Sequence, residues 1–205
     1  MTTLIWAQVA MTLAAAHPPL PTFETLIYHL FASPYPDMQR SFRTATLESA
    51  SKYVNLALPS KAPVGFDPIG VWTSEQALEG VKGKAALSIF VQNIVKPRNI
   101  KQGRAIAMTV GRWDGGDSAF NEWKSKISRL KFRQEEYKRG VMFSQCLPVN
   151  IIMEDYPAIR QVVRQTCTAD YRNSQIFAQV TVVNLNRLHA VREMKSLLDQ
   201  ILLEK

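Results

Sequence analysis

The 205-residue sequence is poor in the residues that bind metals and form disulfide frameworks. It has two cysteines, Cys146 and Cys167, and three histidines, His17, His29 and His189. None of these residues has the spacing of a zinc site, and two cysteines make no disulfide framework. We therefore expect reduced thiols and a cytoplasmic or intracellular location.

The sequence also lacks the short motifs that accompany common enzyme chemistry. It contains no P-loop, no GxGxxG, no GxSxG and no HExxH, and Gly115-Gly116 is typical of a turn. The sequence therefore predicts no catalytic residue, no metal site and no cofactor. One enzymatic alternative stays open, in which Cys146 is a nucleophile that a histidine activates in space.

Long hydrophobic runs are absent as well. No stretch reaches the ~20 apolar residues that a membrane-spanning helix needs. Residues 4–16 are apolar and resemble the core of a signal peptide, but no Lys or Arg precedes them. We interpret residues 3–16 as an apolar helix, which would suit an arm that docks on a neighbouring subunit.

Acidic residues are missing from one part of the chain. None occurs between Glu79 and Asp114, and the segment 80–139 has 14 basic against five acidic residues. The rest of the chain has 11 basic and 12 acidic residues, so the whole net charge of +8 belongs to this segment. A concentrated excess of this kind produces a positive potential over one surface, which favours an anionic partner.

Hydrophobic periodicity and turn residues predict an α+β fold. Helices are expected over 3–16, 22–33, 37–57, 74–81, 118–138, 156–168 and 185–204, and strands over 85–95, 104–112, 141–147 and 174–184. The expected architecture is a helical N-terminal region packed on a mostly four-stranded sheet, with the order β-β-α-β-α-β-α after residue 83. The predicted division is an N-terminal region or arm (1–62), a linker with a short helix (63–82) and an α+β core domain (83–205).

Two basic segments are the candidate binding sites. The first connects the strands 85–95 and 104–112, and the second is the helix 118–138, on which Phe132 lies opposite the apolar stripe. Single-stranded nucleic acid is held by cations that reach phosphates and by aromatic rings that stack on bases. The predicted nucleic-acid-binding residues are Lys96, Arg98, Lys101, Arg104, Arg112, Lys124, Arg129, Lys131, Phe132 and Arg133.

These patterns favour a non-enzymatic nucleic-acid-binding protein with low sequence specificity. The partner is expected to be single-stranded RNA rather than DNA, and a homo-oligomer through the N-terminal helix would suit a self-assembling coat or nucleocapsid-type protein. The alternative is a matrix-type structural protein whose basic face binds an anionic membrane or partner subunits.

Overall fold

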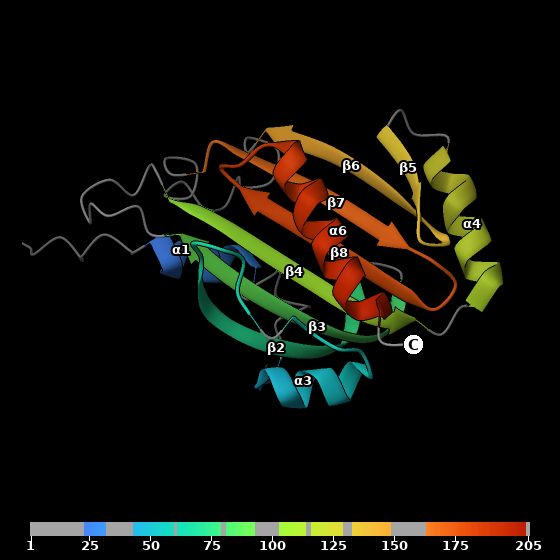
Figure 1. Cartoon of the computed structure of the whole chain (residues 1–205), viewed down its shortest axis with the longest axis horizontal. Coiled ribbons are helices and arrows are strands. Elements are labelled where there is room, and N and C mark those ends of the chain that lie inside the picture. The colour runs from blue at the N-terminus through green and yellow to red at the C-terminus, as the bar shows by residue number, and fades with distance from the viewer. Residues whose placement is uncertain are drawn as a thin grey trace, which may run out of the picture.

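The computed structural model describes residues 23–31, 43–59, 61–78, 81–92, 103–113, 116–128, 133–148 and 163–203. An eight-stranded antiparallel sheet dominates these residues, in the order β1-β2-β3-β4-β8-β7-β6-β5 (Figure 1). The strands are β1 (Arg43–Ala45), β2 (Asp67–Leu78), β3 (Val81–Gln92), β4 (Arg104–Trp113), β5 (Arg133–Tyr137), β6 (Gly140–Pro148), β7 (Gln165–Arg172) and β8 (Ile176–Val183). The helices are α1 (Phe23–Phe31), α3 (Leu47–Val54), α4 (Gly116–Ser128) and α6 (Arg187–Leu203).

Helices α3 and α6 cover one face of the sheet. Alternate residues of a strand point to opposite faces, and the even-numbered residues of β8 are apolar and buried against α6. Helix α6 contributes a stripe with helical spacing to the same core, made of Ala190, Met194, Leu197, Leu198 and Ile201. Helix α3 begins at the capping box of Thr46 and Ser49 and packs across β2, β3 and β4.

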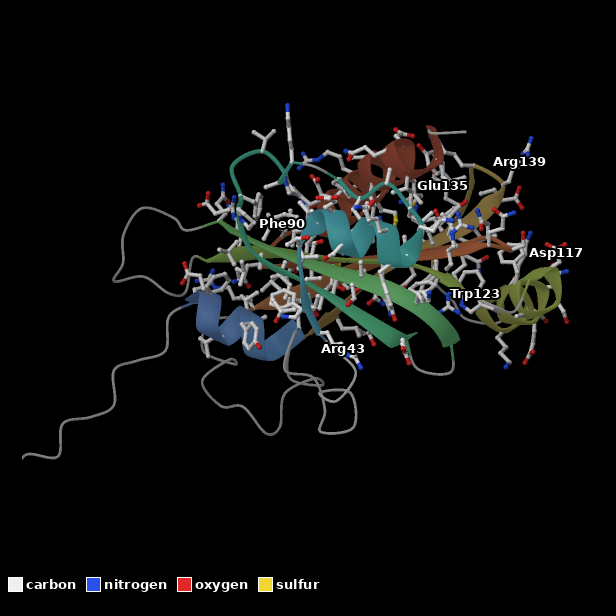
Figure 2. All side chains as sticks on the ribbon, turned by 90° about the horizontal axis from the view of Figure 1, so that it is seen from below. Arg43, Phe90, Asp117, Trp123, Glu135 and Arg139 are labelled. Carbon is white, nitrogen blue, oxygen red and sulfur yellow. A yellow bond between two sulfur atoms is a disulfide. The ribbon has the colours of Figure 1, made fainter. Side chains whose placement is uncertain are left out.

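Helices α1 and α4 lie on the opposite face, near its two ends (Figure 2). Helix α1 buries Phe23, Leu26 and Ile27 against the odd-numbered residues of β3, among them Leu87 and Ile89. Helix α4 is attached more lightly, because its contacting side chains Ala119, Phe120 and Trp123 are only half-buried against Ala85 and Phe177.

The predicted architecture of helices on a four-stranded sheet is wrong. Helices 22–33 and 185–204 correspond to α1 and α6, and the four predicted strands correspond to β3, β4, β6 and β8. Four further strands replace predicted helix or linker, namely β1 within 37–57, β2 within 58–81, β5 at the end of 118–138 and β7 at the end of 156–168. The predicted helix 3–16 lies outside the described residues.

Pairing in the sheet explains the largest of these errors. The run Ser74–Leu78 is rich in the helix formers Glu, Gln, Ala and Leu, yet it pairs with β3 in an antiparallel hairpin. Intrinsic propensity is a weak preference, and the ladder of backbone hydrogen bonds with a buried partner strand overrides it.

The expectation of two reduced cysteines is also wrong. Cys146 on β6 and Cys167 on β7 are directly opposite in the register and form a disulfide with an S–S distance of 2.05 Å. Cys167 is fully buried, whereas Cys146 is exposed. The enzymatic alternative needs a free Cys146 thiol, so this structure does not support it.

Candidate nucleic-acid interface

The structure separates the predicted nucleic-acid-binding residues. Six of the ten lie outside the described residues, and these are Lys96, Arg98, Lys101, Arg129, Lys131 and Phe132. The other four, Arg104, Arg112, Lys124 and Arg133, lie at four separate places on the molecule.

Arg104 and Arg112 stand at the two ends of β4. Eight residues of extended chain place their Cα atoms about 27 Å apart. Arg112 donates hydrogen bonds from Nε and Nη2 to the carbonyl oxygen of Asn55, at 3.2 and 3.1 Å. Asn55 is the C-cap of α3, so Arg112 satisfies a free carbonyl at the negative end of that helix. A structural role therefore accounts for Arg112.

Lys124 and Arg133 lie on opposite sides of the sheet. Arg133 pairs with Ser144 in the register and therefore points to the face that α6 covers. Lys124 belongs to α4 on the other face, where its Nζ lies 3.4 Å from Glu136 Oε1. The described members of the predicted set do not form one basic surface.

A different set of basic residues does come together, in a cleft between α4 and the β5–β6 hairpin. Its volume is about 350 Å³. The residues that line it are Phe120, Lys124, Glu136, Tyr137, Lys138, Arg139, Gly140 and Val141. We name this space the basic cleft, because three of the residues that line it are basic and one is acidic.

The backbone at the tip of the β5–β6 hairpin is unusual. Tyr137 pairs with Gly140, so only Lys138 and Arg139 connect the strands, and their φ angles are 43° and 60°. Two-residue hairpins with positive φ at both positions favour Asn-Gly, because the Cβ of other residues is crowded there. The remaining non-glycine residues with positive φ in the described ranges are both asparagines, Asn55 and Asn184. Two basic residues therefore occupy the turn positions, at a cost in backbone conformational energy.

Buried groups beneath the turn fix its position. The Oη of Tyr171, a fully buried side chain, donates a 2.9 Å hydrogen bond to the carbonyl oxygen of Lys138. Burial raises the pKa of Tyr171, which keeps this donor protonated. A Cβ on Gly140 would come within 2.5 Å of the Arg172 carbonyl and of the Tyr171 ring, so only glycine fits there. The turn is therefore held rigidly against the sheet.

The cations of the basic cleft differ in their partners. Lys138 Nζ lies 2.5 Å from Asp199 Oδ1 on α6, and Tyr137 Oη donates to the same carboxylate oxygen at 2.8 Å. The hydrogen bonds from Lys138 and Tyr137 lower the pKa of Asp199, so its carboxylate stays ionised. Arg139 is exposed and points away from the sheet (Figure 2), and no acidic group of the described residues pairs with it.

An aromatic cluster supports the base of the cleft. The rings of Phe120 and Trp123 are stacked, with centroids 6.1 Å apart, and Trp123 also contacts Phe143 at 5.8 Å. The Arg172 guanidinium lies 4.7 Å from the centroid of the Trp123 ring, in a cation–π contact. Phe120 is the aromatic ring that lines the cleft itself.

Comparison of the chain with protein-family models, with curated proteins and with solved structures finds no match. The function is therefore argued from the geometry of the cleft alone. Among the helices of the described ranges, none has the length and apolar character to cross a bilayer.

Sequence reasoning counted Lys138 and Arg139 in the basic segment but gave them no site role. Lys138 was the last residue of the helix predicted over 118–138 and Arg139 followed it directly, so the turn was not recognised. The available signal was Gly140 directly after two polar residues, since a glycine there is compatible with a tight hairpin.

Proposed function

We propose that this protein is a non-enzymatic nucleic-acid-binding protein and that it contacts the phosphate backbone at the basic cleft. One observation carries the proposal, which is the occupation of a strained two-residue turn by Lys138 and Arg139. Backbone strain that the surrounding structure maintains is common at binding sites, and here it displays a cation at the mouth of a cleft.

The cleft supplies both elements of a single-strand site. Lys124 and Arg139 provide positive charge, whereas the Nζ of Lys138 is paired with Asp199 on α6, and Phe120 provides an aromatic surface for a base. None of these groups reads a base edge through a defined pair of hydrogen bonds, so low sequence specificity is expected. Single-stranded RNA stays the preferred partner over DNA in this proposal.

The affinity of such a site depends on salt. Two phosphate contacts, at Lys124 and Arg139, give a slope of about −1.4 for log K against log salt with single strands. So few contacts give modest affinity for one cleft. A self-assembling coat or nucleocapsid-type setting, with oligomers formed through the N-terminal helix, would place many clefts on one strand.

The compartment belongs to the proposal as well. A cytoplasmic or intracellular location was inferred from unpaired cysteines, and the Cys146–Cys167 disulfide removes that support. Disulfides persist mainly in oxidising compartments, so an oxidising environment suits the folded protein better.

The test is a titration of fluorescent single-stranded RNA at several salt concentrations. The cleft variant Lys124→Gln/Arg139→Gln is compared with Arg43→Gln/Lys61→Gln, which removes the same charge from exposed positions away from the cleft. We expect the cleft variant to bind more weakly, with a slope smaller in magnitude by about 1.4, and the control pair to resemble the wild type.

Two results would overturn the proposal. The first is no RNA binding by the wild type at low salt, and the second is an equal loss in both double variants. Binding to vesicles that contain phosphatidylserine, without binding to RNA, would establish the membrane alternative instead.

A further inference from the structure

Glu136 places a carboxylate among the cations of the basic cleft. Its Oε1 lies 3.4 Å from Lys124 Nζ, and this ion pair joins β5 to α4 across the cleft. The side chains are 84% and 44% exposed, so water screens the pair and it is readily broken. A phosphate oxygen that reached Lys124 would have to replace this carboxylate.

The neighbouring residue has the same charge but faces the other way. Glu135 pairs with Met142 in the register, on the face that α6 covers, and its Oε1 lies 2.6 Å from Lys195 Nζ. Glu136 pairs with Val141 on the face of α4. The two adjacent glutamates each pair with a lysine, but on opposite faces, and only Glu136 lines the basic cleft.

We propose that Glu136 is an internal competitor for the phosphate groups that the cleft binds, and that it sets which anions are accepted. The inference rests on the proposed function and concerns the same site. In the free protein the carboxylate neutralises Lys124, and a bound strand displaces it. Arg139, which has no acidic partner among the described residues, is then the first contact, and Lys124 becomes available only after the exchange.

This exchange favours polymers over small anions. A single carboxylate or inorganic phosphate that replaces Glu136 gains little, because one anion merely substitutes for another at Lys124. A strand offers several phosphates to Arg139 and Lys124 together, so it offsets the lost ion pair with additional contacts. The carboxylate thus selects against free phosphate and for a nucleic-acid backbone.

The deciding experiment compares Glu136→Gln with Glu135→Gln in the same RNA titration. Each variant raises the net charge by one, so any general electrostatic effect is equal in both. We expect Glu136→Gln to bind single-stranded RNA about two- to fivefold more tightly than Glu135→Gln at low salt, which is the range of an exposed ion pair. Inorganic phosphate should compete with RNA better in Glu136→Gln than in the wild type.

A second variant tests whether the effect passes through Lys124. Adding Lys124→Gln to Glu136→Gln should abolish the advantage over the corresponding Glu135→Gln pair, since no cation is left to release. Equal affinities of Glu136→Gln and Glu135→Gln would overturn the inference. If the Lys124→Gln/Arg139→Gln variant still loses binding in that case, the proposed function stands and only the role of Glu136 fails. If the wild type binds no RNA, both fail.

Discussion

At the β7 end of the sheet the two faces bury different kinds of side chain, and β7 shows the contrast within one strand. Its residues that face α6 are apolar or aromatic and fully buried, whereas those on the opposite face are polar. The first set is Cys167, Ala169 and Tyr171, and the second is Thr166, Thr168, Asp170 and Arg172. Helices α6 and α4 differ in the same way, because α6 has five buried side chains and the described side chains of α4 are at most half-buried.

This difference indicates which part of the sheet stabilises the fold and which part is free for binding. The apolar side chains buried under α6, and those that α1 buries on the opposite face, both contribute favourable free energy. Near α4 the molecule instead retains a buried carboxylate, a stacked guanidinium and a lightly attached helix, each of which lowers stability or adds little to it. The basic cleft lies at this end of the sheet.

The largest expected effect tests the contrast between the two helices. Met194 on α6 is fully buried, so Met194→Ala should lower the free energy of unfolding by about 2–5 kcal/mol. Phe120 on α4 is half-buried, so Phe120→Ala should cost about 1–2 kcal/mol. Urea unfolding of both variants measures the difference. Equal losses would show that α4 is as integral to the core as α6.

The next effect concerns Asp170, the buried carboxylate of the polar face. Its Oδ1 accepts a 2.8 Å hydrogen bond from Gln179 Nε2. Burial raises the pKa of Asp170 from 3.8 to about 6, although the Gln179 hydrogen bond and the Arg172 charge act in the opposite direction. The native state therefore holds this proton more tightly than the unfolded chain does.

The contribution of Asp170 to the free energy of unfolding is thus fully present below pH 4. It is lost as the pH rises through 6, because the buried carboxyl group then ionises. The loss amounts to about 3 kcal/mol at neutral pH. Asp170→Asn should flatten the free energy of unfolding between pH 4 and 7, because an amide keeps the acceptor without the charge. Asp67→Asn, at an exposed position of β2, is the control and should leave the profile unchanged. A flat profile in the wild type would contradict the burial of an ionisable Asp170.

Strong periodicity made some elements predictable from the sequence and left others hidden. The sequence alternates strictly over 174–184 and carries an apolar stripe over 185–204. Each pattern has one interpretation, and the structure contains the predicted strand and the predicted helix there. The β5 run Arg133–Tyr137 carries four exposed polar residues, so it has no alternation to detect. Its strand structure comes from pairing with β6, which no local pattern reports.

The candidate site was hidden for a related reason. Charge counting located the basic segment, but a count does not distinguish cations that pair with acids from cations that remain available. Lys126 pairs with Glu122 and Lys138 with Asp199, and Arg112 caps α3. Predicting the second and third of these contacts requires the tertiary fold, because Asp199 and Asn55 are distant in the sequence from the residues that they contact.

The smallest effect tests the strained turn from which the proposed function was argued. Glycine adopts positive φ without penalty, so Arg139→Gly should raise the free energy of unfolding by about 0.5–1 kcal/mol and weaken RNA binding. Arg133→Gly is the matched control, since it removes the same charge from an exposed position of the same hairpin.

Arg133→Gly should have the opposite effect and lower the free energy of unfolding by about 0.5–1 kcal/mol. Glycine increases the conformational entropy of the unfolded chain and has little preference for the extended conformation of β5. Thermal and urea unfolding of the two variants therefore give opposite signs if the turn is strained. A gain in stability together with a loss of RNA affinity in Arg139→Gly would mean that the arginine is kept for binding at the expense of stability. Destabilisation by both substitutions would instead mean that the turn stores no strain, and Arg139 would then have no sign of being kept for binding.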